Sequence, residues 1–186
     1  MRRADEGLGL LVGRSQFPDR AAELLADLGG ITVAPLVLVA VLAYVARRGG
    51  ASGEPCWWAA PFAALLALAS VPVLVSALKA LFDRQGPPGM GTHGGFYPSG
   101  HSTTATVAYG AAALLLVPLV RSAYLRRELL IGAGLLVAAV GLGLVRRGYH
   151  WPLDVVGGWL LGGMILIVMT LGARHLVRPA GDPAEE

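Results

Sequence analysis

The chain alternates long apolar runs with short polar segments. Five runs contain no acidic or basic residue, and most approach the roughly 17–25 residues that a helix needs to cross a bilayer core. Their approximate bounds are residues 31–46, 57–78, 103–120, 129–145 and 155–173. The pattern predicts an all-α polytopic transmembrane bundle of about five spanning helices.

A different pattern precedes the first run. Apolar residues recur there at helical spacing, with charged residues on the opposite face. The apolar positions are Phe17, Ala21, Leu24, Leu25 and Leu28. We expect an amphipathic helix that either lies in the membrane interface or packs under the bundle by the same apolar face.

The domain organisation follows from these patterns. Residues 1–30 form an N-terminal segment with the amphipathic helix, and residues 31–178 form the membrane domain. Residues 179–186 are polar, acidic and proline-containing, so we expect a disordered tail.

Composition supports a membrane protein. The 186 residues are 55% hydrophobic and 15% charged, whereas soluble domains hold roughly 45–50% apolar and about 25% charged residues. The net charge of +3 is modest and the basic residues are dispersed, so a nucleic-acid partner is not expected. Cys56 is the single cysteine, which excludes an internal disulfide and any multi-cysteine metal site.

Three polar clusters stand at the ends of apolar runs, at residues 79–88, 96–102 and 146–154. With five spans, all three emerge on the same side of the membrane as the N-terminus. Basic residues near span ends on the opposite side are Arg47, Arg48, Arg121, Arg126, Arg127, Arg174 and Arg178. Counting basic residues that have no other evident role, the positive-inside rule places that opposite side in the cytoplasm. The clusters are therefore expected to be extracytoplasmic.

The last cluster contains His150 and Asp154, four residues apart. On a helix start they share a face, where the carboxylate can fix one imidazole nitrogen and leave the other free to attack or to take a proton. The alternative is a capping histidine beside an interfacial aspartate.

The middle cluster contains Ser99, Gly100 and His101, directly before an apolar run. Backbone amides at a helix start bind anions, Gly100 permits close approach, and the Ser99 hydroxyl can donate to a phosphoryl oxygen. His101 would stand beside the anion as a proton donor. The alternative is a Pro-Ser helix cap with an exposed histidine.

The first cluster supplies positive charge through Lys79 and Arg84. Phosphate oxygens need such donors, although basic residues at span ends often only extend their charge to the interface. Two histidines, an aspartate, a Ser-Gly turn and several cations on one membrane face together indicate phosphoryl transfer from an anionic substrate.

These motifs resemble those of the type 2 phosphatidic acid phosphatase (PAP2) superfamily of membrane lipid phosphatases. Residues 98–101, Pro-Ser-Gly-His, match the second family motif in full, and His150 and Asp154 match the end of the third. The resemblance covers about residues 57–173. In the first family motif, Lys79 and Pro87 match the expected lysine and proline.

Two family arginines are absent from their usual places. Gly86 stands at one position, and Gly143-Leu144 replace the family's Ser-Arg pair. We expect Arg84 and one of Arg146 or Arg147 to substitute for the missing arginines, because a buried dianion without cations would be costly.

The resemblance implies the following roles. His150 attacks phosphorus and forms a phosphohistidine, Asp154 orients its imidazole, and His101 protonates the leaving oxygen. Phosphate binding is implied for Lys79, Arg84, Ser99, Gly100, Arg146 and Arg147. Neither a metal nor another cofactor is expected, since cations and a helix terminus can stabilise the charge.

The implied partner is a lipid phosphate or diphosphate within the surrounding membrane lipids; the oligomeric state stays open. A polyprenyl (undecaprenyl or decaprenyl) diphosphate is the favoured substrate, and phosphatidate or phosphatidylglycerol phosphate is the close alternative. A lipid phosphotransferase is a related possibility. A non-catalytic lipid-phosphate binding or scaffold protein is the alternative from another class, motivated by the two displaced arginines.

Overall fold

The computed structural model describes residues 2–53, 55–90 and 94–177 of the chain. In these residues the backbone forms seven α-helices and one short 3₁₀ turn, η1, at Val117–Leu119. The helices are α1 (Arg2–Gly13), α2 (Asp19–Leu28), α3 (Val33–Ser52), α4 (Ala59–Phe82), α5 (Gly100–Leu116), α6 (Ala123–Arg146) and α7 (Pro152–Val177).

Five of these helices, α3 to α7, are long and apolar enough to cross a membrane. The predicted all-α bundle with five spans is therefore confirmed. The observed helices extend beyond the apolar runs; α6, for example, begins at Ala123 rather than near Leu129 and includes Arg126 and Arg127. Charged residues lower the hydropathy and so mark the end of an apolar run. Arginine and glutamate are nevertheless good helix formers, so the helix continues past the apolar stretch.

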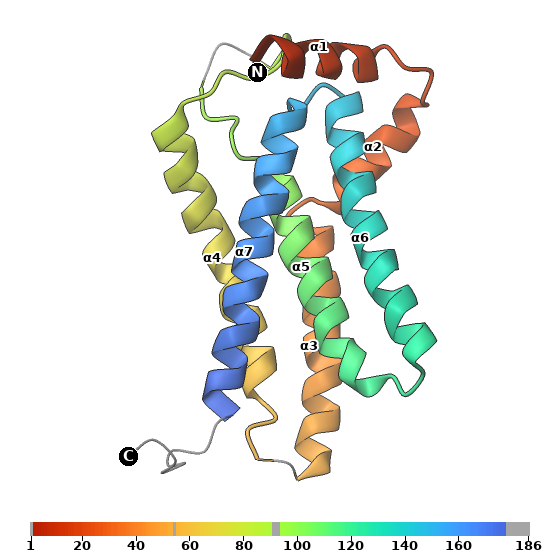
Figure 1. Ribbon diagram of the computed structural model, residues 1–186, viewed down its shortest axis with the longest axis vertical. Helices are drawn as coiled ribbons and strands as arrows, with labels where there is room; N and C mark the ends of the chain where they lie inside the picture. The colour runs from red at the N-terminus through yellow and green to blue at the C-terminus, as the bar shows by residue number, and fades with distance from the viewer. Residues whose placement is uncertain (1, 54, 91–93, 178–186) are drawn as a thin grey trace.

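Helix α5 occupies the centre of the bundle and packs against α3, α4, α6 and α7 (Figure 1). Its contact with α7 is made through small residues. Gly158 of α7 lies against Ser102 of α5, and Gly162 lies against Thr106 one turn further along. Small residues let two helix backbones approach closely in a membrane, which fixes the start of α5 beside the start of α7.

Helix α2 is the predicted amphipathic helix, and it packs against α6. Ala22 and Ala26 are buried in this contact, and a Cβ at Gly143 of α6 would lie 2.6 Å from the Ala22 carbonyl oxygen. Leu25 lies in the same contact and Leu28 packs against the core, whereas Leu24 is exposed. Part of the predicted apolar face is thus turned onto the protein, as the second of the two sequence-based alternatives predicts.

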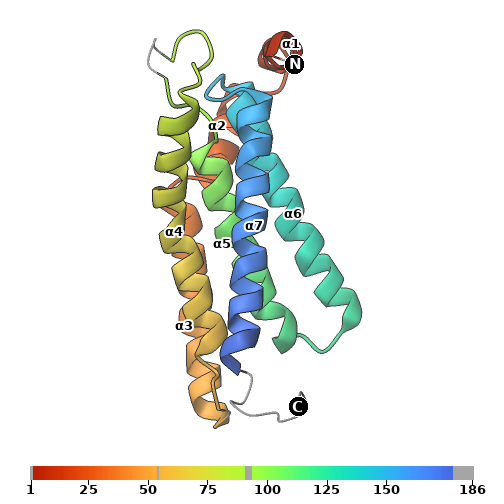
Figure 2. The same ribbon diagram turned by 60° about the vertical axis from the view of Figure 1, so that its left-hand side comes forward.

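Helix α1 was not expected from the sequence. It lies across one end of the bundle (Figures 1 and 2) and packs on the ring of Trp151, where a Cβ at Gly9 would come within 2.8 Å. Gly7 and Gly9 lower the helix propensity of this segment and interrupt its apolar pattern. Its helix is instead stabilised by contacts with distant residues.

The three polar clusters meet at one end of the bundle. Both views show the α4–α5 loop and the α6–α7 turn at the end that α1 covers (Figures 1 and 2). The geometric prediction that five spans bring the clusters to one side is confirmed. The predicted tail at residues 179–186 lies outside the described residues, and the division at residue 30 stays a prediction.

Candidate active site

The first turn of α5 is held against the first turn of α7. Ser99 is the N-cap of α5, and its side-chain oxygen accepts a hydrogen bond from the Ser102 N–H at 3.3 Å. The Ser99 N–H donates to the Asp154 carbonyl oxygen at 2.9 Å, and the Ser102 hydroxyl donates to the Val155 carbonyl oxygen at 3.0 Å. These bonds place the positive end of the α5 dipole beside Asp154.

A pocket of about 420 Å³ opens next to this turn. Lys79, Gly100 and His101 line it together with two hydroxyl residues, Ser76 and Thr104. The rest of the wall is apolar and comes from the start of α3 and from α4; its residues are Ile31, Pro35, Leu68, Val71, Pro72 and Val75. The pocket therefore joins a polar, basic end to a hydrocarbon-lined groove.

His150 and Asp154 lie together at the start of α7. The Asp154 side chain is fully buried, and its Oδ2 atom stands 3.6 Å from His150 Nδ1. That oxygen also accepts a hydrogen bond from the Trp151 N–H at 3.1 Å. At 3.6 Å the two atoms are too far apart for a hydrogen bond, and the buried Nδ1 atom has no hydrogen-bond partner among the described residues.

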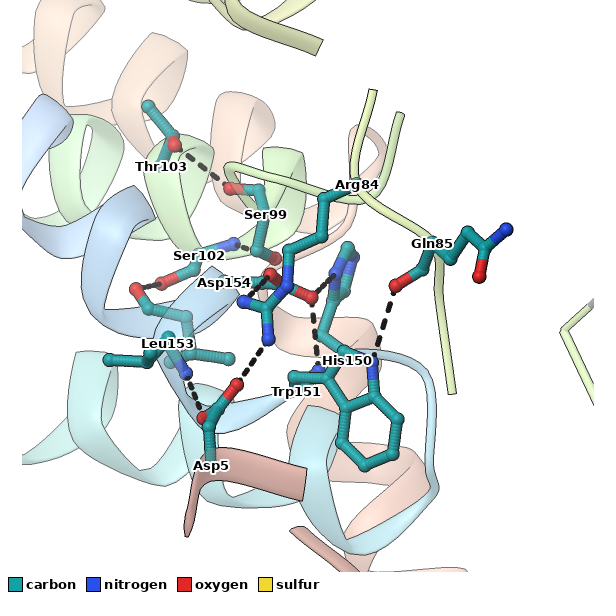
Figure 3. Close-up of polar contacts among 11 residues, drawn as sticks. Asp5, Arg84, Gln85, Ser99, Ser102, Thr103, His150, Trp151, Leu153 and Asp154 are labelled. Carbon is teal, nitrogen blue, oxygen red and sulfur yellow. Dashed lines mark hydrogen bonds and ion pairs between the residues drawn. The ribbon is translucent and has the colours of Figure 1, made fainter. Parts of the chain in front are cut away.

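Arg84 binds the other oxygen of the same carboxylate. Its Nη1 atom donates to Asp154 Oδ1 at 2.6 Å, and its Nη2 atom forms an ion pair with Asp5 of α1 (Figure 3). The guanidinium thus bridges two buried carboxylates. The sequence predicted Arg84 as a phosphate ligand, and the structure places it on Asp154.

An aromatic ring occupies the space beside Gly86, the first position where the family arginine is absent. A Cβ at Gly86 would lie 2.6 Å from the Phe96 ring. The same ring meets His150 edge-on, with ring centroids 5.9 Å apart. No side chain fits at position 86 while Phe96 stays where it is, which is a steric reason for the glycine.

The second missing arginine position, Leu144, is buried in the apolar core. Arg146 and Arg147 follow it but contact the N-terminal segment. Arg146 donates to the carbonyl oxygens of Phe17 and Gly13 at 3.0 Å and pairs with Asp19 at 2.9 Å. These contacts engage all three nitrogen atoms of the Arg146 guanidinium.

Arg147 joins a network that links α2 to the α6–α7 turn. It donates to Glu23 at 2.6 Å, and the Tyr149 hydroxyl lies 2.8 Å from both oxygens of that carboxylate. The hydrogen bond from Tyr149, followed by that from Arg147, lowers the pKa of Glu23. The same bond to Glu23 raises the pKa of Tyr149. Glu23 is therefore kept as a carboxylate that docks α2.

The two histidines line different pockets. His150 borders a second pocket, of about 390 Å³, together with Arg146 and Arg147, whereas His101 borders the apolar-walled pocket with Lys79. The structure thus brings the three predicted catalytic residues to one end of the bundle, with the imidazoles approached from two openings.

Sequence reasoning missed several contributors, namely Asp5, Asp19, Glu23, Phe96 and Tyr149. The carboxylates belong to the N-terminal segment and meet the site only through tertiary packing. Acidic side chains outside the apolar runs are ordinarily solvated, so their types and spacing gave no signal. Phe96 and Tyr149 adjoin the recognised motifs, but their roles follow only from their contacts with His150 and Glu23.

A polytopic helical bundle that carries a buried His–Asp pair, a second histidine at a helix start and a basic pocket is suited to phosphoryl transfer in a membrane. Comparison with protein families found a match over residues 60–177 to the PAP2 superfamily. The match spans most of the chain, so this protein belongs to the PAP2 superfamily, and it is a PAP2-type lipid phosphatase.

The fold has a counterpart among solved structures. The chain is similar to the transmembrane PAP2-type phosphatidylglycerolphosphate phosphatase from Bacillus subtilis, with a TM-score of 0.78 and 23% sequence identity. The alignment covers 97% of this chain and 89% of that chain. At this identity the similarity establishes the fold alone, including the N-terminal helices outside the family match. Comparison with curated proteins found no match.

Proposed function

We propose that this chain hydrolyses a phosphate ester or diphosphate on an amphiphilic lipid through a phosphohistidine formed on His150. The observation that carries the proposal is the pocket in which Lys79 and His101 end an apolar groove. A phosphate at its polar end and a hydrocarbon chain along α3 and α4 would both meet matching surfaces. The buried His150–Asp154 pair adjoins this end of the bundle.

In the first step, His150 Nε2 attacks phosphorus, and the bond from phosphorus to the leaving oxygen breaks. His101 gives its proton to that oxygen, so the lipid leaves as an alcohol or a monophosphate. The Asp154 carboxylate favours an imidazole that carries its proton on Nδ1. The present distance of 3.6 Å between Nδ1 and Oδ2 can shorten when substrate binds, as catalytic contacts often do.

In the second step, water attacks the phosphohistidine and His101 takes the proton of that water. The N–P bond breaks, phosphate is released and both histidines return to their starting states. His150 must therefore be neutral while His101 is protonated, which requires different surroundings for the two. Asp154 beside His150 and Lys79 beside His101 favour the opposite assignment in the free protein, so the proposal relies on the anionic substrate phosphate bound beside Lys79 to favour a protonated His101.

Charge on the transferring group is stabilised in this proposal by Lys79 and by the Gly100 amide at the start of α5, both of which line the pocket. Ser99 is fully buried, and binding of phosphate by its hydroxyl stays a prediction from the sequence. The contacts of Arg84 support a role in holding Asp154. Those of Arg146 and Arg147 support a role in docking the N-terminal segment. Direct binding of phosphate by any of the three arginines stays a prediction from the sequence.

A polyprenyl diphosphate is the substrate that we propose first, with the site on the extracytoplasmic face. Phosphatidylglycerol phosphate is the second candidate, favoured by the description of the similar Bacillus subtilis structure as a phosphatidylglycerolphosphate phosphatase. Phosphatidate belongs to the same chemical class. These candidate substrates differ most in their hydrocarbon tails. The apolar wall of the pocket can contact any hydrocarbon tail, so it does not favour one candidate over the others.

Phosphate release by purified protein tests the proposal on three lipids: a polyprenyl diphosphate, phosphatidylglycerol phosphate and phosphatidate. We expect turnover of at least one, complete loss with His150→Ala, and persistence in EDTA. A wild type inactive on all three would favour the lipid-binding scaffold. Transfer of phosphate to an added lipid alcohol in place of water would favour the phosphotransferase.

Sidedness has a separate test. Met90 is exposed in the α4–α5 loop, so Met90→Cys in a Cys56→Ser background provides a single thiol. A membrane-impermeant maleimide should label it in intact cells. Labelling only after the cells are opened would place the site in the cytoplasm.

A further inference from the structure

Asp5 of α1 is a buried carboxylate beside the candidate active site. Its side chain is 2% exposed. One oxygen accepts a hydrogen bond from the Leu153 N–H at 2.8 Å, and the other forms the ion pair with Arg84 (Figure 3). Both oxygens are thus engaged at the start of α7, although Asp5 lies far from the site in sequence and outside the residues that match the family.

The packing of α1 sets the position of Asp5. Gly9 follows Asp5 by one helical turn, so the two residues share a face of α1. The Trp151 ring lies directly against Gly9, where a Cβ would come within 2.8 Å. This close approach brings the face that carries Asp5 onto the first turn of α7.

Arg84 connects Asp5 to the nucleophile pair. Its two terminal nitrogens divide between Asp5 and Asp154, and Asp154 in turn faces His150. Two carboxylates and one guanidinium leave one formal negative charge next to the imidazole. That surplus matters, because His150 gains positive charge as it forms a bond to phosphorus.

We propose that Asp5 is a positioning residue for this reaction: by sharing the Arg84 guanidinium, it keeps the Asp154 carboxylate oriented toward His150 and only partly neutralised. The inference rests on the proposed role of His150. Without Asp5, the whole guanidinium would be free to neutralise Asp154, and the imidazole would lose its stabilising charge.

A purely structural role would be to cap α7 through the Leu153 N–H. An asparagine could accept that hydrogen bond equally well, because its side-chain oxygen is also an acceptor. A buried carboxylate costs more to desolvate than an amide, and Arg84 compensates that cost here. The charge of Asp5 therefore acts on Arg84, while its hydrogen bond to Leu153 needs only an oxygen.

Asp5→Asn separates the two roles, because it keeps the cap and removes the charge. We expect kcat to fall about tenfold or more, the scale on which losing a hydrogen-bond partner that orients a metal ligand lowers activity in metalloenzymes. KM should change by less than about twofold, because Asp5 does not touch the substrate. Glu6→Gln is the matched control: Glu6 is on the same helix but pairs with the exposed Arg2, and its kcat should equal that of the wild type.

The Arg84→Gln background shows whether Asp5 acts through Arg84. There, Asp5→Asn should change the remaining kcat by less than about twofold, since coupled residues are not additive. An equal loss in both backgrounds, or a rise in KM with kcat unchanged, would overturn the proposal.

A readout independent of turnover keeps this inference distinct from the proposed function. Diethyl pyrocarbonate labels neutral imidazoles, and at about pH 8 an ordinary histidine is neutral. We expect His150 to react several-fold more slowly in Asp5→Asn than in the wild type, relative to the exposed His175 at the far end of α7. Asp5→Glu keeps the charge and should retain more of the rate.

An unchanged labelling ratio in Asp5→Asn would overturn the role of Asp5 even if the enzyme is active. A reduced ratio in a protein without lipid phosphatase activity would support the positioning of His150 and reject the proposed reaction. The two failures are therefore distinguishable.

Discussion

Gly158 tests how strictly the contact between α5 and α7 sets the site. A Cβ at this position would lie 2.8 Å from both the Ser99 carbonyl oxygen and the Ser102 Cβ. An ordinary contact begins near 3.4 Å, so Gly158→Ala must push the start of α5 away from α7. Both neighbouring atoms are on or next to the backbone, and no side-chain rotation can relieve the contact.

The expected cost follows from that displacement. Overpacking of this kind typically destabilises by about 1–3 kcal/mol, and the gain in helix propensity from glycine to alanine offsets up to about 1 kcal/mol. Gly163 is the matched control, because it is on the same helix and a Cβ there meets no atom within 4 Å. Relative to Gly163→Ala, Gly158→Ala should lose about 1–3 kcal/mol.

Activity should fall as well, because the Ser99 N–H is bonded to the Asp154 carbonyl oxygen across this contact. A misplacement of about 1 Å can cost on the order of 100-fold in rate, so a smaller shift predicts roughly tenfold. Thermal unfolding in one detergent and kcat for phosphate release measure the two effects. Equal melting temperatures and equal kcat for both alanine variants would refute the account of this contact.

Other contacts give further expected outcomes. Hydrogen bonds from Tyr149 and Arg147 lower the pKa of Glu23. The stabilisation by this carboxylate is therefore present above the unfolded carboxyl pKa and lost as pH falls through the lower folded value. Glu23→Gln should flatten the decline in melting temperature as the pH is lowered below the ordinary carboxyl pKa. Tyr109→Phe removes a hydrogen bond to a carbonyl at the end of α2 and should lower unfolding free energy by about 1 kcal/mol with kcat unchanged. Lys79→Ala should reduce kcat/KM by at least about tenfold, and Lys79→Arg should retain more activity.

The membrane bundle and the meeting of the three polar clusters at one of its ends were predictable because they depend on local and additive properties. A run of about 20 apolar residues predicts a span wherever it occurs, and alternation of sides follows from the count of spans. The Pro-Ser-Gly-His turn and the His150–Asp154 spacing were also visible, since each depends on residues within one helical turn.

The contacts of the arginines were not predictable in the same way. Arg84, Arg146 and Arg147 have long side chains with several acceptors in reach, and their partners come from α1 and α2 or from the start of α7. The sequence could show that positive charge is needed near the phosphate. It could not show that carboxylates of the N-terminal segment compete for those charges.

Helix α1 illustrates the same limit. Its glycines lower the expected helicity, yet Gly9 is what allows the helix to pack on Trp151. A residue that weakens the local signal thus strengthens the tertiary contact. Only the packed structure reveals that this segment lies over the candidate active site.

The proposed phosphohistidine on His150 is tested most directly by trapping it. Protein mixed with a polyprenyl diphosphate or phosphatidylglycerol phosphate would be quenched within a turnover at alkaline pH, digested and analysed by mass spectrometry. We predict a transient phosphoryl group on the peptide that contains His150, absent in His150→Ala. Phosphate release by the wild type with no modified peptide, or with the group on His101, would contradict the assignment of His150 as the nucleophile.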